Sequence, residues 1–287
     1  MPELPEVETV RHGLQPAMEG ATIERLEVRR KDLRFPFQPD FAARLAGQVI
    51  TSLGRRAKYL LADLGSGDVL LMHLGMSGSF RVVSDEAATA PGAFHHPRSD
   101  DRAHDHVVFH MSSGTSVIYN DPRRFGFMKI FARKDIDHEP FLKDIGPEPL
   151  GNAFDAAMLA GALAGKKTSL KAALLDQRVV AGLGNIYVCE ALHRAHVHPE
   201  RPAGSIKPKA LSKLVAAIRA VLEDAIRAGG STLRDYRHTD GELGYFQHDF
   251  RVYDREGDPC PTASCPGAIQ RIVQAGRSTF FCPVCQK

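Results

Sequence analysis

Apolar and polar residues follow two different periods along the chain, and the period changes near its middle. In the first half, short runs rich in β-branched and apolar residues are separated by Gly, Asp and Ser, which is typical of strands. The runs lie at residues 21–30, 47–64, 67–74, 106–111 and 115–121. No long helical segment separates them, so we expect an antiparallel sandwich or barrel. One helix should precede them, from Glu6 to about Met18, with Pro5 suited to its first turn.

From about Gly151 to Gly229 the apolar residues instead recur at helical spacing, with Gly or Pro at the breaks. The helical segments lie at residues 154–165, 169–177, 185–195 and 207–229. The pattern predicts an α+β protein: an N-terminal antiparallel sandwich or barrel preceded by a helix, then a helical bundle and a separate cysteine-bearing tail. We expect domains at residues 1–135, 150–245 and 251–287.

The tail has the cysteine spacing of a metal site. Cys260 and Cys265 form one close pair, Cys282 and Cys285 form another, and two short strands joined by "QAG" are expected between them. Two such pairs suit a tetrahedral site of four thiolates, so we predict one structural Zn²⁺. Four cysteine ligands leave no open position for catalysis. Cys189 falls on an apolar helical face and is expected to be a buried small side chain.

Length and charge narrow the class of protein. The 287 residues carry 37 Lys and Arg against 34 Asp and Glu, a net charge of +3. We find neither a signal peptide nor a run of about 18 apolar residues that would span a membrane, and we expect a cytoplasmic monomer.

A small, polar segment at 83–105 predicts a long loop; its His95 and His96 are either solvated loop residues or part of a metal site.

Basic residues gather locally although the whole chain is almost neutral. The clusters are "GRRAKYL" (54–60), "DPRRFGFMK" (121–129) and "GKKTSLK" (165–171). Such patches can converge on one polyanion, and "RRFGF" places aromatics beside arginines, as in side chains that stack on bases. The alternative is an ordinary strand. Met76, between glycines in "HLGMSGS", is either a core residue or an apolar side chain held out toward a partner.

The opening "MPELPEVETV" raises a chemical possibility. Removal of Met1 would leave Pro2 with a secondary amine, which is far less protonated at neutral pH than a lysine side chain. Such an amine can attack an aldehyde-like carbon to form an iminium, and Glu3 and Glu6 lie close enough to move protons. The simpler alternative is that Glu6 and Glu8 favour the start of a helix electrostatically.

Taken in order, the motifs resemble those of bacterial formamidopyrimidine-DNA glycosylases from Pro2 to the last residues. The motifs are "PELPEVET", "RRAKYLL", "HLGMSG", "DPRRFG", "GPEPL", "KKT", "GLGNIY" and the four-cysteine finger. The resemblance implies an N-terminal antiparallel β-sandwich with flanking helices, a C-terminal helix-two-turn-helix bundle and a β-hairpin zinc finger. It also implies base excision repair of double-stranded DNA: removal of oxidised purines, 8-oxoguanine and formamidopyrimidines, followed by nicking of the strand through β,δ-elimination.

Residue by residue, the resemblance implies that Pro2 forms the Schiff base with the sugar C1′ and that Glu3 moves protons beside it. Glu6 orients the chain terminus, Lys58 grips phosphates and donates a proton in β-elimination, and Arg277 binds phosphate and assists δ-elimination. The residues that fill the duplex after base flipping would be Met76, Arg123 and Phe125, with Arg123 facing the orphaned cytosine. The remaining phosphate contacts would be His104, Lys167 and Asn185.

Two departures from the family pattern affect these expectations. Four residues separate Cys260 from Cys265 where two are common, and an insertion at 83–102 leaves His106 as a substitute for His104. A lesion-capping loop is expected near 234–244. The alternatives are an endonuclease VIII-like glycosylase for oxidised pyrimidines, or a zinc-containing DNA-binding protein without catalysis.

Overall fold

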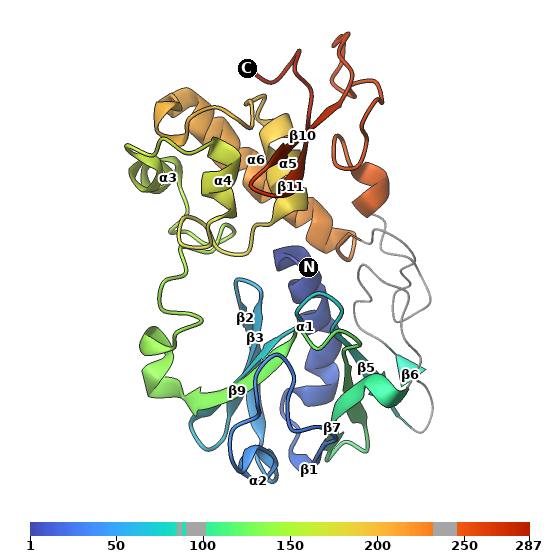
Figure 1. Ribbon diagram of the computed structural model, residues 1–287. Helices are drawn as coiled ribbons and strands as arrows, with labels where there is room; N and C mark the ends of the chain where they lie inside the picture. Colours follow the sequence, from blue (N-terminus) through green and yellow to red (C-terminus); the bar gives the residue numbers. More distant parts are fainter. Residues whose placement is uncertain (85–87, 90–101, 232–245) are drawn as a thin grey trace. The chain divides into compact units, whose positions relative to one another are not determined.

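The computed structural model describes residues 1–84, 88–89, 102–231 and 246–287 (Figure 1). It divides into two units, Met1–Lys143 with Ile226–Gln247 and Asp144–Ala225 with His248–Lys287. Of the loop expected at 83–105, residues 85–87 and 90–101, with His95 and His96, lie outside the described residues, as does all of the expected lesion-capping loop. The described part of that range is not all loop, because it contains a short strand at Ala88–Thr89 and a 3-10 helix at Arg102–His104. Within the described ranges, no helix combines the length and apolar character needed to cross a bilayer.

The first unit is a sandwich of two antiparallel sheets. One sheet has the order β1 (Ile23–Val28), β7 (Asp105–Met111), β8 (Ser116–Asn120), β5 (Ser79–Val83) and β6 (Ala88–Thr89). The other has the order β2 (Ile50–Arg56), β3 (Tyr59–Leu64), β4 (Asp68–His73) and β9 (Phe127–Ala132). The predicted sandwich is therefore confirmed.

Individual strands differ from the pattern in two ways. The run at 47–64 is two strands, β2 and β3, because the chain turns back at Ala57 and Lys58, where Ala57 takes a positive φ of 51°. Strands β5, β6 and β9 were not predicted, and β6 lies inside the expected loop. Strands β5 and β9 each follow directly on a turn that contains glycine, at Gly78 and Gly126, and these turn residues obscure the apolar pattern of the strand.

Helix α1 (Leu4–Met18) begins two residues earlier than expected, because Glu3 and Glu6 form a capping box at its start. It buries Val7, Val10 and Leu14 in the core that also fills the space between the sheets. The other helical segments of this unit are α2 (Phe41–Leu45), η1 (Arg102–His104) and η2 (Arg133–His138).

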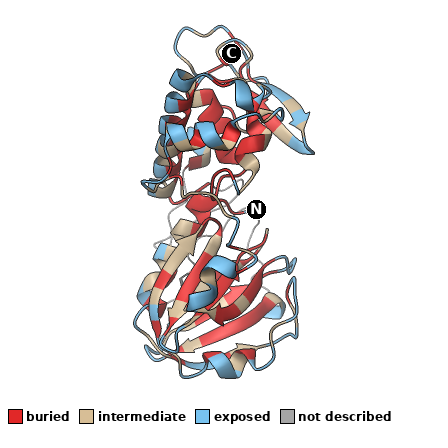
Figure 2. Cartoon of the chain, turned by 90° about the vertical axis from the view of Figure 1, so that its left-hand side faces the viewer, coloured by how far each residue is buried: buried red, intermediate tan, exposed pale blue. Residues whose placement is uncertain are grey.

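The second unit is helical and carries the cysteine tail. Its helices are α3 (Ala156–Leu163), α4 (Leu170–Leu175), α5 (Asn185–Arg194), η3 (Ala203–Ser205) and α6 (Pro208–Arg227), which ends in the first unit. A short helix η4 (Phe246–Asp249) crosses the unit boundary. The predicted helices are thus confirmed. In both units buried residues follow the strands and inner helices, while exposed residues lie on loops and outer helix faces (Figure 2).

The tail forms the predicted hairpin of β10 (Gln270–Gln274) and β11 (Arg277–Phe281). Ala275 and Gly276 connect them, with φ of 48° and 72°. Two positive φ values in a two-residue loop are those of a type I′ turn, whose twist suits a hairpin. Arg277 is the first residue after this turn and is exposed.

Candidate functional site

The amino end of the chain is held by a buried carboxylate. Glu6 is 0% exposed, and its Oε2 accepts the Glu3 backbone N–H at 2.8 Å. Its Oε1 accepts two further hydrogen bonds, from the N–H and the hydroxyl of Ser231, each at 2.8 Å. Pro2 and Glu3 are also buried. The first residues are therefore fixed in place by Glu6.

The electrostatic environment at this end favours a neutral amine. The amine in the structure is that of Met1, one residue before the nitrogen of Pro2. Burial lowers its pKa below the ordinary value; Glu3 and Glu6 raise the pKa, and Lys58 and Arg123 lower it. A Pro2 amine freed by loss of Met1 would be close to the same four charges. A neutral amine is the form that can act as a nucleophile.

Lys58 and His73 lie close enough to the amino group for their electrostatic interactions to matter. Lys58 lies in the turn between β2 and β3, yet it is only 7% exposed. Burial, together with the positive charges of Lys58, Arg34 and the chain's amino group, lowers the pKa of His73 to about 4. The His73 ring is therefore neutral near pH 7, and its Nδ1 accepts the Gly75 N–H at 3.1 Å.

Met76, Arg123 and Phe125 lie on two turns, residues 74–78 and 121–126, which we call the wedge turns. The fully buried Asp121 connects them. Its Oδ1 accepts the Ser77 hydroxyl at 2.5 Å, while its Oδ2 accepts the Gly126 N–H at 2.8 Å and the Tyr119 hydroxyl at 3.2 Å. The Ser77 oxygen in turn accepts the Arg123 N–H at 3.2 Å. The two turns therefore form one hydrogen-bonded unit.

The wedge turns also approach too closely to admit a side chain at Gly75. Gly75 has a φ of +68°, and a Cβ built on it would lie 2.4 Å from the Gly126 nitrogen. At the surface of this unit, the Arg123 guanidinium lies over the ring of Phe125, 4.6 Å from its centroid. Phe125 is 43% exposed and Met76 is half-buried. Apolar and cationic groups are thus presented together on a rigid base.

The two candidate histidines have different surroundings. His106 is 2% exposed, and its Nε2 is 2.9 Å from the carbonyl oxygen of Asp121. His104 is partly exposed at the end of η1. Because His106 is enclosed by its own unit, His104 is the better placed of the two to meet a ligand.

In the second unit, Arg277 begins strand β11, and hydrogen bonds from two side chains hold the next residues of that strand. Asn185, the first residue of α5, donates from Nδ2 to the Ser278 carbonyl at 2.9 Å. Lys171 donates from Nζ to the same carbonyl at 3.0 Å and to the Thr279 hydroxyl at 2.6 Å. Lys171 is fully buried, so its expected place in an exposed basic cluster is wrong; Lys167 is exposed.

The basic cluster at 54–60 also differs from expectation. Arg55 donates from Nε to Glu8 at 2.8 Å and from Nη1 to the Ala57 carbonyl at 2.9 Å. Glu8 also pairs with Arg11 at 2.7 Å. Glu8 therefore offsets part of the charge of Arg55 inside its unit, which leaves less of this cluster for a polyanion.

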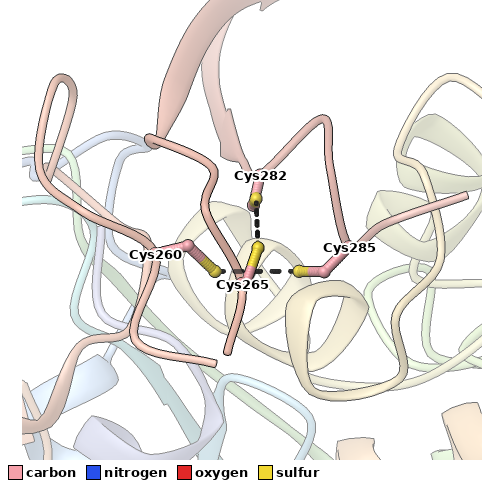
Figure 3. A group of neighbouring side chains, drawn as sticks. All are labelled: Cys260, Cys265, Cys282 and Cys285. Atoms are coloured by element: carbon pink, nitrogen blue, oxygen red, sulfur yellow. Dashed lines mark hydrogen bonds between the residues drawn. The ribbon is translucent and has the colours of Figure 1, made fainter. Parts of the chain in front are cut away.

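The four cysteine sulfurs have the geometry of a tetrahedral site (Figure 3). The sulfurs of Cys260 and Cys285 are 3.7 Å apart, those of Cys265 and Cys282 are 3.6 Å apart, and all four lie within 4.8 Å of one another. Zinc–sulfur bonds of about 2.3 Å place tetrahedral sulfurs roughly 3.8 Å apart, which these distances match. Cys189 is buried beside them, as predicted.

Three family models match successive parts of the chain: the β-sandwich, the helical part and the cysteine tail. Residues 1–128 match the formamidopyrimidine-DNA glycosylase N-terminal domain, 145–237 match the H2TH domain of the same enzymes, and 257–287 match a zinc finger found in FPG and IleRS. The chain belongs to the formamidopyrimidine-DNA glycosylase family. It is accordingly a DNA glycosylase of base excision repair, in a family of glycosylase/AP lyases, and its finger holds one structural zinc ion.

Individual members of the family are similar over the full length. The formamidopyrimidine-DNA glycosylases of Rhodopseudomonas palustris (strain HaA2) and Bradyrhizobium sp. (strain BTAi1) are 73% and 70% identical, with 100% of each chain covered. Among solved structures, the MutM (Fpg) protein of Thermus thermophilus is 41% identical, with a TM-score of 0.82 over 99% of this chain and 98% of that one.

Two further structures contain DNA. A Lactococcus lactis FPG mutant with a Fapy-dG containing DNA is 35% identical, with a TM-score of 0.86 over 100% of both chains. The Lactococcus lactis Fpg with an abasic site containing DNA is 34% identical, with a TM-score of 0.84 over 99% of both chains.

Sequence reasoning overlooked three residues that position the expected site residues of this glycosylase. Asp121 stands inside a motif that was noted only for its arginines and aromatics. Ser231 had no signal, because 225 residues separate it from Glu6. Lys171 was grouped with its basic neighbours, and its burial could not be foreseen from charge alone.

Proposed function

We propose that this chain excises oxidised purines, 8-oxoguanine and formamidopyrimidines, from double-stranded DNA through a Schiff base on Pro2, and then nicks the strand. The observation that carries the proposal is the amino end itself. Pro2 and Glu3 are buried there, the charges of Glu3, Glu6, Lys58 and Arg123 act on the amine, and burial lowers the pKa of that amine.

The reaction begins after Met1 is removed. The Pro2 nitrogen attacks C1′, the glycosidic bond breaks, and the base leaves as the sugar ring opens to an iminium. Glu3 accepts and returns protons in these steps, while Glu6 fixes the backbone that carries the amine. Loss of a proton from C2′ then expels the 3′ phosphate in β-elimination, in which Lys58 donates a proton. Arg277 assists δ-elimination of the 5′ phosphate.

The wedge turns suit the space that a flipped base leaves. Met76 and Phe125 supply apolar surface, and Arg123 supplies hydrogen-bond donors for the unpaired cytosine. His104, Lys167, Asn185 and Arg277 would contact phosphates. One Nδ2–H of Asn185 already donates to the Ser278 carbonyl. A phosphate contact would therefore use another N–H of this residue, at the start of α5.

The DNA complexes of the Lactococcus lactis relatives support DNA as the partner. We propose that the chain acts as a monomer on DNA in the cytoplasm. We also propose that residues 1–135 supply the chemistry, while residues 150–245 and the finger at 251–287 grip the backbone of the duplex.

The proposal is tested by blocking the amine. Protein whose Met1 has been removed is compared with protein carrying one added residue before Pro2, on a duplex with 8-oxoguanine opposite cytosine. We expect base release and nicking to stop in the extended protein, while binding to the duplex stays within about threefold because phosphate contacts supply most of it. Nicking by the extended protein would exclude Pro2 as the nucleophile. Faster release of an oxidised pyrimidine would instead support the endonuclease VIII-like alternative.

A further inference from the structure

A histidine of the helical part lies directly against the zinc ligands. His193, near the end of α5, is 0% exposed, and its Nε2 is 3.5 Å from Cys260 Sγ. The same nitrogen is 3.4 Å from the hydroxyl of Thr262. The other ring nitrogen, Nδ1, has no hydrogen-bond partner in the part of the chain that the structure describes. All polar contacts of the ring are therefore directed at the cysteine site.

The longer spacing between Cys260 and Cys265 supplies the second part of this contact. Thr262 lies within the extra residues, and its hydroxyl is 3.8 Å from Cys285 Sγ as well as close to His193. The knuckle is closed by the Cys265 N–H, which donates to the Thr262 carbonyl at 3.0 Å. The longer Cys260–Cys265 segment thus places the Thr262 hydroxyl between His193 and a second zinc ligand, Cys285.

Once zinc is bound, the histidine must be the donor and the cysteine sulfur the acceptor of this hydrogen bond. Four thiolates around Zn²⁺ leave the site with net negative charge, so hydrogen-bond donors that point at the sulfurs stabilise it and fix the ligands. With a proton on Nε2, His193 donates to Cys260. With the proton on Nδ1 instead, the ring would bury an N–H that has no acceptor among the described residues, which is costly.

We propose that His193 is a positioning residue of the zinc site: its Nε2–H donates to the Cys260 thiolate, Thr262 supports this contact, and the hydrogen bond slows loss of the metal. Helix α5 thereby ties the helical part to the finger through the metal site itself. The same helix already binds the segment before the finger, because Glu190 accepts the backbone N–H groups of Val252 and Tyr253 at 2.9 Å.

The test uses the full-length, zinc-loaded protein and three variants. His193→Phe keeps the ring volume and removes the donor, while His193→Gln keeps an N–H at a similar reach. His198→Phe is the matched control, because the His198 ring packs on Phe281 with centroids 4.7 Å apart. Transfer of zinc to a chromogenic chelator is followed over time. We expect release to be about 10–100-fold faster in His193→Phe, and close to the original rate in the other two variants.

Two outcomes contradict the proposal. Release from His193→Phe at the original rate would show that the contact does not hold the metal. Equal acceleration in the Phe and Gln variants would show that ring packing, and not donation, matters. If the Phe variant does not fold, the unmodified protein still decides: ¹⁵N NMR of the histidine rings should show His193 protonated on Nε2, and an Nδ1–H form would overturn the assignment.

Discussion

Glu6 accepts two hydrogen bonds from Ser231, one from its N–H and one from its hydroxyl, each 2.8 Å long, although 225 residues separate the two in sequence. The other oxygen of the same carboxylate holds the Glu3 N–H. A residue distant in sequence therefore takes part in fixing the amino end, where the proposed nucleophile lies.

Replacing Glu6 should misplace that end. In Glu6→Gln an NH₂ group must face one of the three N–H or O–H donors, at a cost of about 2–3 kcal/mol. If half or more of this cost falls on the placement of the amine, base excision should slow at least about fivefold. Ser231→Ala removes only the hydroxyl and should slow excision less. Single-turnover rates measure both, and equal rates for Glu6→Gln and the unaltered protein would remove Glu6 from the site.

Asp121 should matter to both stability and duplex recognition. Asp121→Asn sets an NH₂ group against the donors Ser77, Gly126 or Tyr119, so we expect a loss of about 2–3 kcal/mol in the free energy of unfolding. Tyr119→Phe removes one hydrogen bond and is the milder control. Urea denaturation measures the stability. An Asp121→Asn protein as stable as the original would show that the wedge turns do not depend on this carboxylate.

His73 predicts a pH dependence of stability. Its pKa is about 4 in the folded protein and about 6.5 when unfolded, so the unfolded state binds more protons between these values. Stability should fall as the pH is lowered from about 6.5 to 4, with a total contribution of about 3 kcal/mol. His73→Asn keeps an acceptor for the Gly75 N–H but does not titrate. Its unfolding free energy should fall less steeply over the same range, and an unchanged slope would contradict the assignment.

Arg277 should account for one phosphate contact. Arg277→Ala should weaken binding to all duplexes alike and reduce the slope of log affinity against log salt concentration by about one unit. Arg271→Ala is the control on the same hairpin, because Arg271 lies 3.9 Å from Glu256, which partly balances its charge. Binding titrations at several salt concentrations measure both slopes. A smaller change for Arg277 than for Arg271 would exclude Arg277 as the contact.

The parts of the fold that the sequence predicted are those with local signals. The apolar, β-branched run at residues 106–111 and the helical spacing at 207–229 reappear as β7 and α6. The cysteine spacing predicted the finger, because two close pairs of thiolates are needed for one metal ion. Strands β5 and β9 were missed since the glycines and charged residues of the preceding turns dominate those windows.

Roles that depend on long-range contacts were not predictable in this way. Lys171 and Lys167 stand in the same basic stretch, yet one is fully buried against the Ser278 carbonyl and the other is exposed. Similarly, His104 and His106 looked interchangeable until the contact of His106 with the Asp121 carbonyl was known. Composition carries no information on which member of such a pair faces inward.

The central claim is that the Pro2 amine forms a covalent intermediate with the sugar. Borohydride added during the reaction with an 8-oxoguanine duplex should reduce the iminium, and digestion with mass spectrometry should place the adduct on Pro2. An adduct on Lys58, or a nicked strand with no adduct, would contradict the account.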